Sequence, residues 1–336
     1  MKQIIILLAT VSMAVTIHAQ DRGAAGTYFS GKGLSNNSAY EISTPAQLAK
    51  LAELVNTGEV VSGTYFKLTA DINLSAYSSN RNNGKGWIPI GTALNAFSGH
   101  FNGNNHTISG LYINDSELEF AGLFGVISFG GSVQNLSVEV NITGGNHTGG
   151  ITGSIGYFCN ITNCSVTGNV LGGVCIGGIA GQSSGTITNC YATSEVNGVD
   201  IIGGVVGDLS HNGLITSCYA TGAVSGNFSV GGIAGHLYQS TIENCAALNP
   251  RVTRLSGENT SFGRVAGHND EGTITGNAAR EDMVVIDEIS TNSDGISLDG
   301  ITISRDIIAR DGTIGGRFTR SNGWNVQNGK LPEHIR

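Results

Sequence analysis

The sequence predicts an all-β protein, a right-handed parallel β-helix built from coils of ~27 residues with an N-terminal capping helix. Two interleaved repeats carry this prediction. A five-residue glycine phrase recurs at residues 149–153, 177–181, 203–207 and 231–235 and fades at 263–267. A second phrase, typically Ile-Thr-Asn-Cys, ends at cysteines that lie 26 to 28 residues apart. Self-similarity at this period is typical of a stacked array, because no single repeat can bury its own apolar face.

The residue pattern inside one coil favours strands over helices. From Ile187 to Val196, small and apolar residues alternate with polar ones, which is strand periodicity with a corner. Gly, Thr, Ser, Asn and Val dominate the coils, and these residues favour strands and turns. A leucine-rich repeat has a similar period but requires a regular leucine frame, and a propeller blade requires ~40 residues. We therefore predict about three short strands per coil.

Stacking of the coils predicts ladders of like residues ~4.8 Å apart. The expected ladders are Ile161, Ile187, Ile215 and Ile242; Val170, Val196, Val224 and Val252; and Cys164, Cys190, Cys218 and Cys245. We expect the inward cysteines to stay reduced, since this spacing holds Cβ atoms farther apart than a disulfide requires. Cys159 and Cys175 lie outside the ladder, and their redox state stays open. The glycine phrase indicates a turn where backbones pass closely or take positive φ.

The N-terminal residues predict export. Residues 1–19 have the charge, the short apolar run and the small final residue of a signal peptide, cleaved near Ala19. Residues 20–39 are polar and Gly-rich, and we expect a flexible segment. No other stretch approaches the 18 apolar residues of a membrane span. We therefore predict a secreted or cell-surface location, with no transmembrane span in the mature chain.

A helix is predicted directly after residue 44. Thr44 can cap it, Pro45 suits its first turn, and Gln47 completes a capping box. Its single apolar face favours a cap over the first coil, which a solenoid needs, rather than a partner-binding helix. The chain then divides into an N-terminal cap with irregular first coils (40–121), regular coils (122–280), and last coils with a C-terminal cap (281–336). The loops near 75–86 and 254–262 are open candidates for recognition.

The repeats resemble a known family. Gly122-Leu-Phe-Gly125, followed by the Gly-Gly-Ile/Val-Ala-Gly phrases and Asn-Cys-Tyr-Ala-Thr, resembles the GLUG-motif repeats of bacterial exported proteins. Related repeats occur in immunoglobulin-A peptidases and haemagglutinin-like adhesins. Segments 66–74, 87–91 and 101–111 are similar to the lead-in of such proteins, and 323–332 to their closing segment. The resemblance covers roughly residues 40–280. It implies the fold, export, and a spacer or binding surface, and it implies no catalytic residue.

The sequence offers no set of catalytic residues. A net charge of −8 argues against nucleic-acid partners. No His is followed by Glu, so the His-Glu-x-x-His motif of metallopeptidases is absent. A glycosidase needs paired carboxylates, but the ladder positions after the valines read Leu171, Asn197, Ser225 and Thr253. We therefore predict no enzyme and no cofactor.

Two ladders could bind a ligand. Tyr191 and Tyr219 should stack outward on adjacent coils, where aromatic rows bind sugar rings or partner chains but more often stabilise a sheet. The row after the glycine phrase reads Ser154, Gln182, Asp208, His236 and His268. Asp208, His236 and His268 could meet a transition metal. We interpret them instead as a hydrated polar row and predict no metal, because the longer last repeat leaves the register of His268 open.

The function that fits best is a non-catalytic, adhesin-like binding protein for a host or matrix glycan or protein. Its flat, repetitive walls and scarce carboxylates favour binding over chemistry. One alternative is a carbohydrate-active β-helix enzyme, a polysaccharide lyase or glycosidase, since that fold hosts both. Another is a structural spacer in a surface assembly. The ligand, the means of attachment and the oligomeric state stay open.

Overall fold

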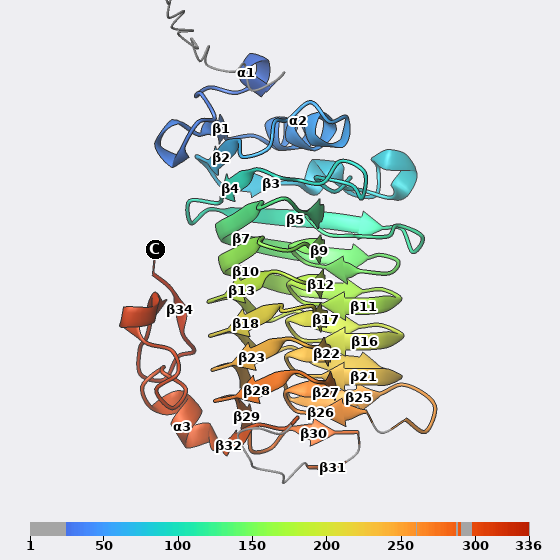
Figure 1. The fold of residues 1–336 in the computed structure, drawn as a ribbon, viewed down its shortest axis with the longest axis vertical. Helices are drawn as coiled ribbons and strands as arrows, with labels where there is room; N and C mark the ends of the chain where they lie inside the picture. The colour runs from blue at the N-terminus through green and yellow to red at the C-terminus, as the bar shows by residue number, and fades with distance from the viewer. Residues whose placement is uncertain (1–24, 260, 287, 290–297, 336) are drawn as a thin grey trace, which may run out of the picture.

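The computed structural model describes residues 25–259, 261–286, 288–289 and 298–335. The chain forms a tall parallel β-helix with its N-terminal coils at one end and its last coils at the other (Figure 1). The predicted fold class is therefore confirmed. The signal peptide predicted for residues 1–19 lies outside the described residues. None of the described helices has the length and apolar character needed to cross a membrane.

Three stacked sheets form the walls. The largest sheet contains β1 (Tyr40–Ile42), β2 (Tyr65–Leu68), β3 (Ile72–Asn73), β4 (His100–Asn102), β5 (Thr107–Asn114), β7 (Ser132–Thr143), β10 (Asn160–Leu171), β13 (Thr186–Thr188), β14 (Tyr191–Ala192), β15 (Glu195–Asn197), β18 (Leu214–Thr216), β19 (Tyr219–Ala220), β20 (Val224–Gly226), β23 (Thr241–Glu243), β24 (Ala246–Ala247), β25 (Arg251–Arg254), β28 (Thr273–Thr275), β29 (Ala278–Arg280), β30 (Val284–Val285), β31 (Glu288–Ile289) and β32 (Ile301–Ile303). The second contains β8 (Thr148–Gly149), β11 (Val174–Gly177), β16 (Asp200–Gly203), β21 (Phe228–Gly231) and β26 (Phe262–Gly263). The third contains β6 (Phe124–Ile127), β9 (Thr152–Ile155), β12 (Ala180–Ser183), β17 (Val206–Ser210), β22 (Ala234–Tyr238) and β27 (Ala266–Asp270).

The predicted ladders are confirmed by the strand registers. The isoleucine ladder runs from Ile161 to Ile242 and continues to Ile274. The valine ladder runs from Val170 to Val252. The expectation of about three strands per coil is too low. Corners divide the part of each coil that lies in the largest sheet into separate strands, so one coil contains β13 to β17. Side chains of both ladders are buried in one continuous core, as alternation along the strands requires.

The cysteine ladder is present as predicted. All six cysteines are unpaired and buried. The backbone N–H of Cys164 donates to the sulfur of Cys190 at 3.4 Å, and the Cys190 N–H donates to Cys218 at 3.3 Å. The same contact joins Cys218 to Cys245, and Asn277 takes over at the end of the row, where its Oδ1 accepts from the Cys245 N–H at 2.8 Å. Each sulfur thus serves as an acceptor for the coil before it.

Asparagines set one corner of the coil. Asn135, Asn163, Asn189 and Asn244 each directly precede an inward ladder residue and have φ between 52° and 53°. Asn tolerates this left-handed conformation better than most residues. The side chains also link coils, since Asn163 Nδ2 donates to Asn135 Oδ1 at 3.1 Å. The Asn in the repeated Ile-Thr-Asn-Cys phrase is therefore a turn residue.

The glycine phrase marks close contact between coils. A Cβ on Gly204 would lie 2.1 Å from the carbonyl oxygen of Gly232 on the next coil, and one on Gly232 would lie 2.2 Å from that of Arg264. Neither glycine is among those with positive φ. Of the two predicted reasons for the phrase, close passage of backbones is therefore the one that applies here. Where the phrase fades, Arg264 is fully buried and its guanidinium donates to Thr302 and Gly300.

A helix caps the N-terminal end, as predicted. Helix α2 (Pro45–Asn56) lies over the first strands (Figure 1), and its buried leucines join the main core. Thr44 Oγ1 accepts from the Gln47 N–H at 3.2 Å, while Gln47 Oε1 accepts from the Ser43 N–H at 2.9 Å. The side chain of Gln47 therefore accepts from the backbone N–H of Ser43, and not from that of the cap residue Thr44 as a capping box predicts. Short turns η1 (Asn36–Ser38), η2 (Ser75–Tyr77) and η3 (Asn82–Gly84) complete this end.

Residues 25–39 were expected to be flexible, but they fold against the core. Helix α1 (Ala25–Tyr28) buries Ala25 completely. Phe29 is 5% exposed, and its ring centroid lies 6.0 Å from that of Tyr40 and 5.9 Å from that of Phe66. The mostly polar composition of this segment did not indicate that Phe29 would pack against the core. The expectation of flexibility is therefore wrong for this part of the segment.

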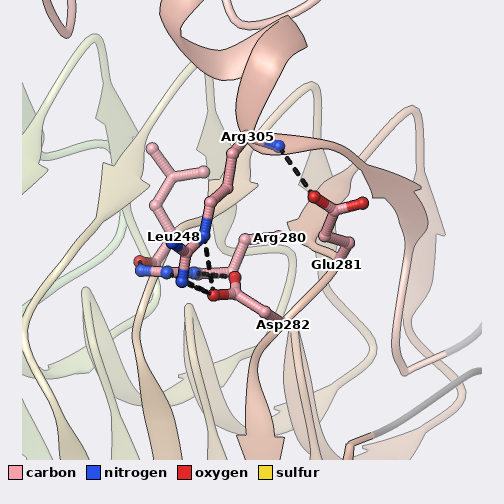
Figure 2. A network of polar contacts seen from close by, with 5 residues as sticks. All are labelled: Leu248, Arg280, Glu281, Asp282 and Arg305. Carbon is pink, nitrogen blue, oxygen red and sulfur yellow. Dashed lines mark hydrogen bonds and ion pairs between the residues drawn. The ribbon is translucent and has the colours of Figure 1, made fainter.

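The C-terminal residues also differ from their expected role as an end cap. After β32, helix α3 (Arg305–Arg310), turn η4 (Arg320–Asn322) and the antiparallel pair β33 (Trp324–Asn325) and β34 (Glu333–His334) run back along the outside of the largest wall (Figure 1). We call residues 304–335 the C-terminal strap. Figure 2 shows its first anchor: Asp282 accepts hydrogen bonds from both Arg280 and Arg305.

Candidate functional site

One wall carries a row of polar side chains on neighbouring strands. Asp208 on β17, His236 on β22 and His268 on β27 are in register. The predicted row is therefore real, including its uncertain last step. Register is regained because the additional residues of the longer repeat lie in the loop near 254–262, where Arg254 Nη1 donates to the Asn259 carbonyl at 3.1 Å.

The row contains a compact cluster of charge. His236 Nδ1 donates to Asp208 Oδ1 at 2.8 Å, and the two imidazole rings stack with centroids 5.6 Å apart. Sequence reasoning missed Asp270, which reaches both rings: its carboxylate oxygens lie 3.3 Å from His236 Nε2 and 3.4 Å from His268 Nε2. The available signal was its position two residues after His268, which places both on one face of a strand.

The cluster perturbs the titration of its members. The hydrogen bond to Asp208 raises the pKa of His236, with Asp270 adding to the shift and burial opposing it. The hydrogen bond from His236 lowers the pKa of Asp270, and His268 adds to that shift. His236 is the more enclosed ring, 21% exposed, whereas His268 is 42% exposed. The cluster can therefore bind a cation or a polar ligand from solvent.

Tyr191 and Tyr219 form the predicted stack on adjacent coils. Their ring centroids lie 4.9 Å apart with planes 1° from parallel. The C-terminal strap covers them: Trp324 lies 6.2 Å from Tyr191 and 5.7 Å from Tyr219, between centroids. Tyr219 is only 2% exposed. An external ligand would have to displace the strap to reach this pair, so its binding role stays a prediction.

A row of exposed aromatic side chains was not predicted. It lies at the turns that join the third sheet to the largest one, and we call it the aromatic turn row. Its members are Phe129, Tyr157, Phe158, His211 and Tyr238. Phe158 is 89% exposed and Phe129 79% exposed. The His211 ring lies 6.3 Å from that of Tyr157 and 5.3 Å from that of Tyr238, between centroids.

The turn row and the charged cluster adjoin each other. Tyr238 is in register with Asp270 on the next coil, and the coil between Tyr157 and His211 has Ser184 at its turn. The small serine leaves space for rings two coils apart to meet. A signal for the row exists in the sequence, since Phe129 precedes a Gly-Gly pair and Phe158 lies two residues after Gly156, at points where strands end.

The loop near 75–86 contributes a separate hollow of about 550 Å³ beside the capping helix. Its walls include Ala49 and Ala52 from α2, with Tyr77 and Trp87 opposite. The Trp87 indole is 2% exposed and its Nε1 donates to the Leu123 carbonyl at 3.0 Å. Most of the Trp87 ring therefore supports the cap rather than facing a ligand.

Comparisons with known proteins agree with the repeats and the fold. The GLUG motif matches residues 144–171, 172–197 and 226–253. A "Putative Gly-rich membrane protein" from Evansella cellulosilytica is 39% identical over 121 residues, which is 36% of this chain and 13% of that protein. Halomucin from Haloquadratum walsbyi is 34% identical over 142 residues, 40% of this chain and 2% of that protein. The chain thus spans only a small part of these relatives.

A solved structure shares the whole architecture. A "putative immunoglobulin A1 protease" from Bacteroides ovatus superposes with a TM-score of 0.73, covering 93% of this chain and 96% of that one, at 23% identity. At this identity the likeness concerns the fold alone. The interleaved phrases, their in-register stacking and three separate motif matches lead to one conclusion. The chain is a parallel β-helix, and three of its coil-length segments match the GLUG motif.

Proposed function

We propose that the protein is a secreted or surface-exposed binding protein that holds a linear glycan along the aromatic turn row. The observation that carries this proposal is the state of Phe129 and Phe158. Both have positive φ, 52° and 61°, and both project into solvent. A left-handed backbone costs a non-glycine residue about 1–2 kcal/mol, and an exposed ring recovers none of it by burial. Strain of this kind is typical of functional positions.

The chemistry of the row favours a sugar polymer. Aromatic faces bind apolar surfaces such as those of sugar rings, and the hydroxyl of a tyrosine adds a polar contact. The rings lie at several heights along one wall, with a gap at the coil of Ser184, which suits an extended chain better than a compact ligand. Charged residues make up only 12% of the sequence, so a neutral partner fits. A relative named a membrane protein and another named halomucin support a location at the cell surface.

A glycan array with purified protein tests this function. We expect binding to a restricted group of polysaccharides, and we expect Phe129→Ala with Phe158→Ala to weaken it tenfold or more, as for central aromatic contacts. Leu94→Ala is the matched control, since Leu94 is also 89% exposed but lies in a loop outside the row. Equal binding by the double variant and the wild type would overturn the proposal.

The same experiment separates the alternatives. Binding to a protein array that depends on the two phenylalanines, with none to glycans, would assign the row to a protein partner. Release of reducing ends from a bound polysaccharide would instead favour a carbohydrate-active enzyme. Cleavage of immunoglobulin A1 is tested alongside, because the solved relative carries that name.

A further inference from the structure

The charged cluster has the composition of a transition-metal site. His236 and His268 lie on neighbouring strands, and Asp270 projects from the same face of β27 as His268. Donor atoms from these three side chains all lie within 4.8 Å of one another. The three side chains therefore lie close enough together for one ion to reach a donor atom of each.

The distances match those of a tetrahedral ion. Zinc binds imidazole nitrogen at about 2.0–2.1 Å and carboxylate oxygen at about 2.0–2.2 Å, so two ligand atoms at a tetrahedral angle are about 3.4 Å apart. The separations from Asp270 Oδ2 to His236 Nε2 and from Asp270 Oδ1 to His268 Nε2 are 3.3 and 3.4 Å. The donor atoms of all three side chains lie within 4.8 Å of one another, and side-chain rotation completes the tetrahedral arrangement when an ion binds.

Asp208 prepares the most enclosed ligand. Its carboxylate accepts the Nδ1 proton of His236 at 2.8 Å, so Nε2, which faces Asp270 at 3.3 Å, is the nitrogen that can bind an ion once its proton is displaced. A carboxylate behind a histidine ligand is the usual arrangement in zinc sites, where it sets the tautomer and the ring orientation. Asp208 is 14% exposed, so it is held in place by the wall around it.

We propose that His236, His268 and Asp270 bind one transition-metal ion of the zinc class, with Asp208 as the outer-shell partner of His236. Two imidazoles favour Zn²⁺, Cu²⁺ or Ni²⁺ over Ca²⁺ and Mg²⁺, which prefer oxygen ligands. The exposure of His268 and Asp270, 42% and 55%, leaves the remaining coordination positions open to water or to an outside ligand. This site is independent of the glycan proposal.

Calorimetric titration of the metal-stripped, tag-free full chain with Zn²⁺ tests the proposal, and Co²⁺ absorption reports the geometry. We expect one ion per chain and no response to Ca²⁺ or Mg²⁺. His236→Ala, His268→Ala and Asp270→Asn should each abolish this binding, and Asp208→Asn should weaken it by 10- to 100-fold. His106→Ala is the matched control, because His106 also contacts a carboxylate, Asp71, at 3.1 Å.

The variants are informative only if the chain stays folded. Asp270→Asn serves this purpose, since it alters an exposed side chain at a strand end, and circular dichroism checks each variant. Failure of Zn²⁺ to bind at millimolar concentration would overturn the proposal. So would binding that persists unchanged in both the His268→Ala and the Asp270→Asn chains, because the ion would then lie elsewhere.

Discussion

The phenol oxygen of Tyr219 donates a hydrogen bond of 2.7 Å to the carbonyl oxygen of Pro332, 113 residues further along the chain. This contact joins the outer face of the β-helix wall to the end of the C-terminal strap. Burial between the two raises the pKa of Tyr219 well above that of an ordinary phenol. The strap and the wall together form a second apolar cluster, separate from the core inside the coils.

Replacing Tyr219 with Phe should destabilise the strap. The substitution keeps the ring but leaves the Pro332 carbonyl without its buried donor, which costs about 1–3 kcal/mol. Urea unfolding followed by circular dichroism measures the effect. Tyr191→Phe is the control, because Tyr191 is stacked in the same row but less buried, and we expect a smaller change. Equal effects of both substitutions would contradict a specific role for the Pro332 contact.

Trp324 should be the main apolar anchor of the strap. It is fully buried, and its Nε1 donates to Asn189 Oδ1 at 3.3 Å. Trp-to-Ala changes in cores cost about 3–5 kcal/mol, so Trp324→Ala should detach the strap while leaving the coils intact. Trp324→Phe, which keeps an apolar ring, should have a much smaller effect.

Trypsin offers a clean readout of this detachment. Residues 86–250 contain no Lys or Arg, whereas the strap contains Arg305, Arg310 and Arg317. We expect rapid cleavage of the Trp324→Ala chain within the strap, and a stable fragment that retains the coils. Cleavage at the same rate in wild type and variant would show that the strap does not depend on this side chain.

The repeating part of the fold was accessible from the sequence because stacked coils give equivalent residues equivalent surroundings. Ile187 and Ile215 recur for that reason, and their period alone predicts that they are neighbours. Asn163 and Asn189 carried a further signal that could have been used, since Asn is favoured at left-handed corners. The same logic extended to the row of His236 and His268.

The rest depends on contacts that do not repeat. Nothing in the repeat period relates Tyr219 to Pro332. The outward pair of Tyr191 and Tyr219 therefore looked like an exposed surface, although the C-terminal strap covers it. Asp270 was missed because it lies three residues beyond the repeated phrase and two beyond His268, outside the row that the repeats define. The exposed residues Phe129 and Phe158 were missed because the turns that carry them do not share a repeated sequence. Features that occur only once in the chain therefore account for the parts of the candidate site that the repeats did not predict.

The six thiols should be unreactive in the folded protein. Burial raises the pKa of Cys175 to about 12 and raises the pKa values of Cys164, Cys190 and Cys218 well above normal. The thiolate is the reactive form, so we expect Ellman's reagent to detect no thiol at pH 8 without denaturant and all six in guanidinium. A count below six in denaturant would indicate a disulfide and contradict the reduced ladder.

Acid should weaken the anchor at Asp282. Hydrogen bonds from Arg280 first and Arg305 second hold the pKa of this carboxyl well below its usual range. A carboxyl with a lowered folded-state pKa stabilises the fold above its unfolded pKa, about 3.9, and loses that contribution as pH falls below it. Arg305 is 70% exposed, so solvent screening limits the contribution to about 1 kcal/mol or less.

The comparison with Asp282→Asn isolates this group. The difference in urea midpoint between wild type and variant should be constant from pH 7 to about pH 5 and should shrink below about pH 4, as the wild-type carboxyl becomes protonated. Glu281→Gln is the neighbouring control: its carboxylate accepts only from the Arg305 backbone N–H, at 3.1 Å, among the contacts of the described residues. A midpoint difference that stays constant down to pH 2.5 would show that Asp282 acts through packing and not through its charge.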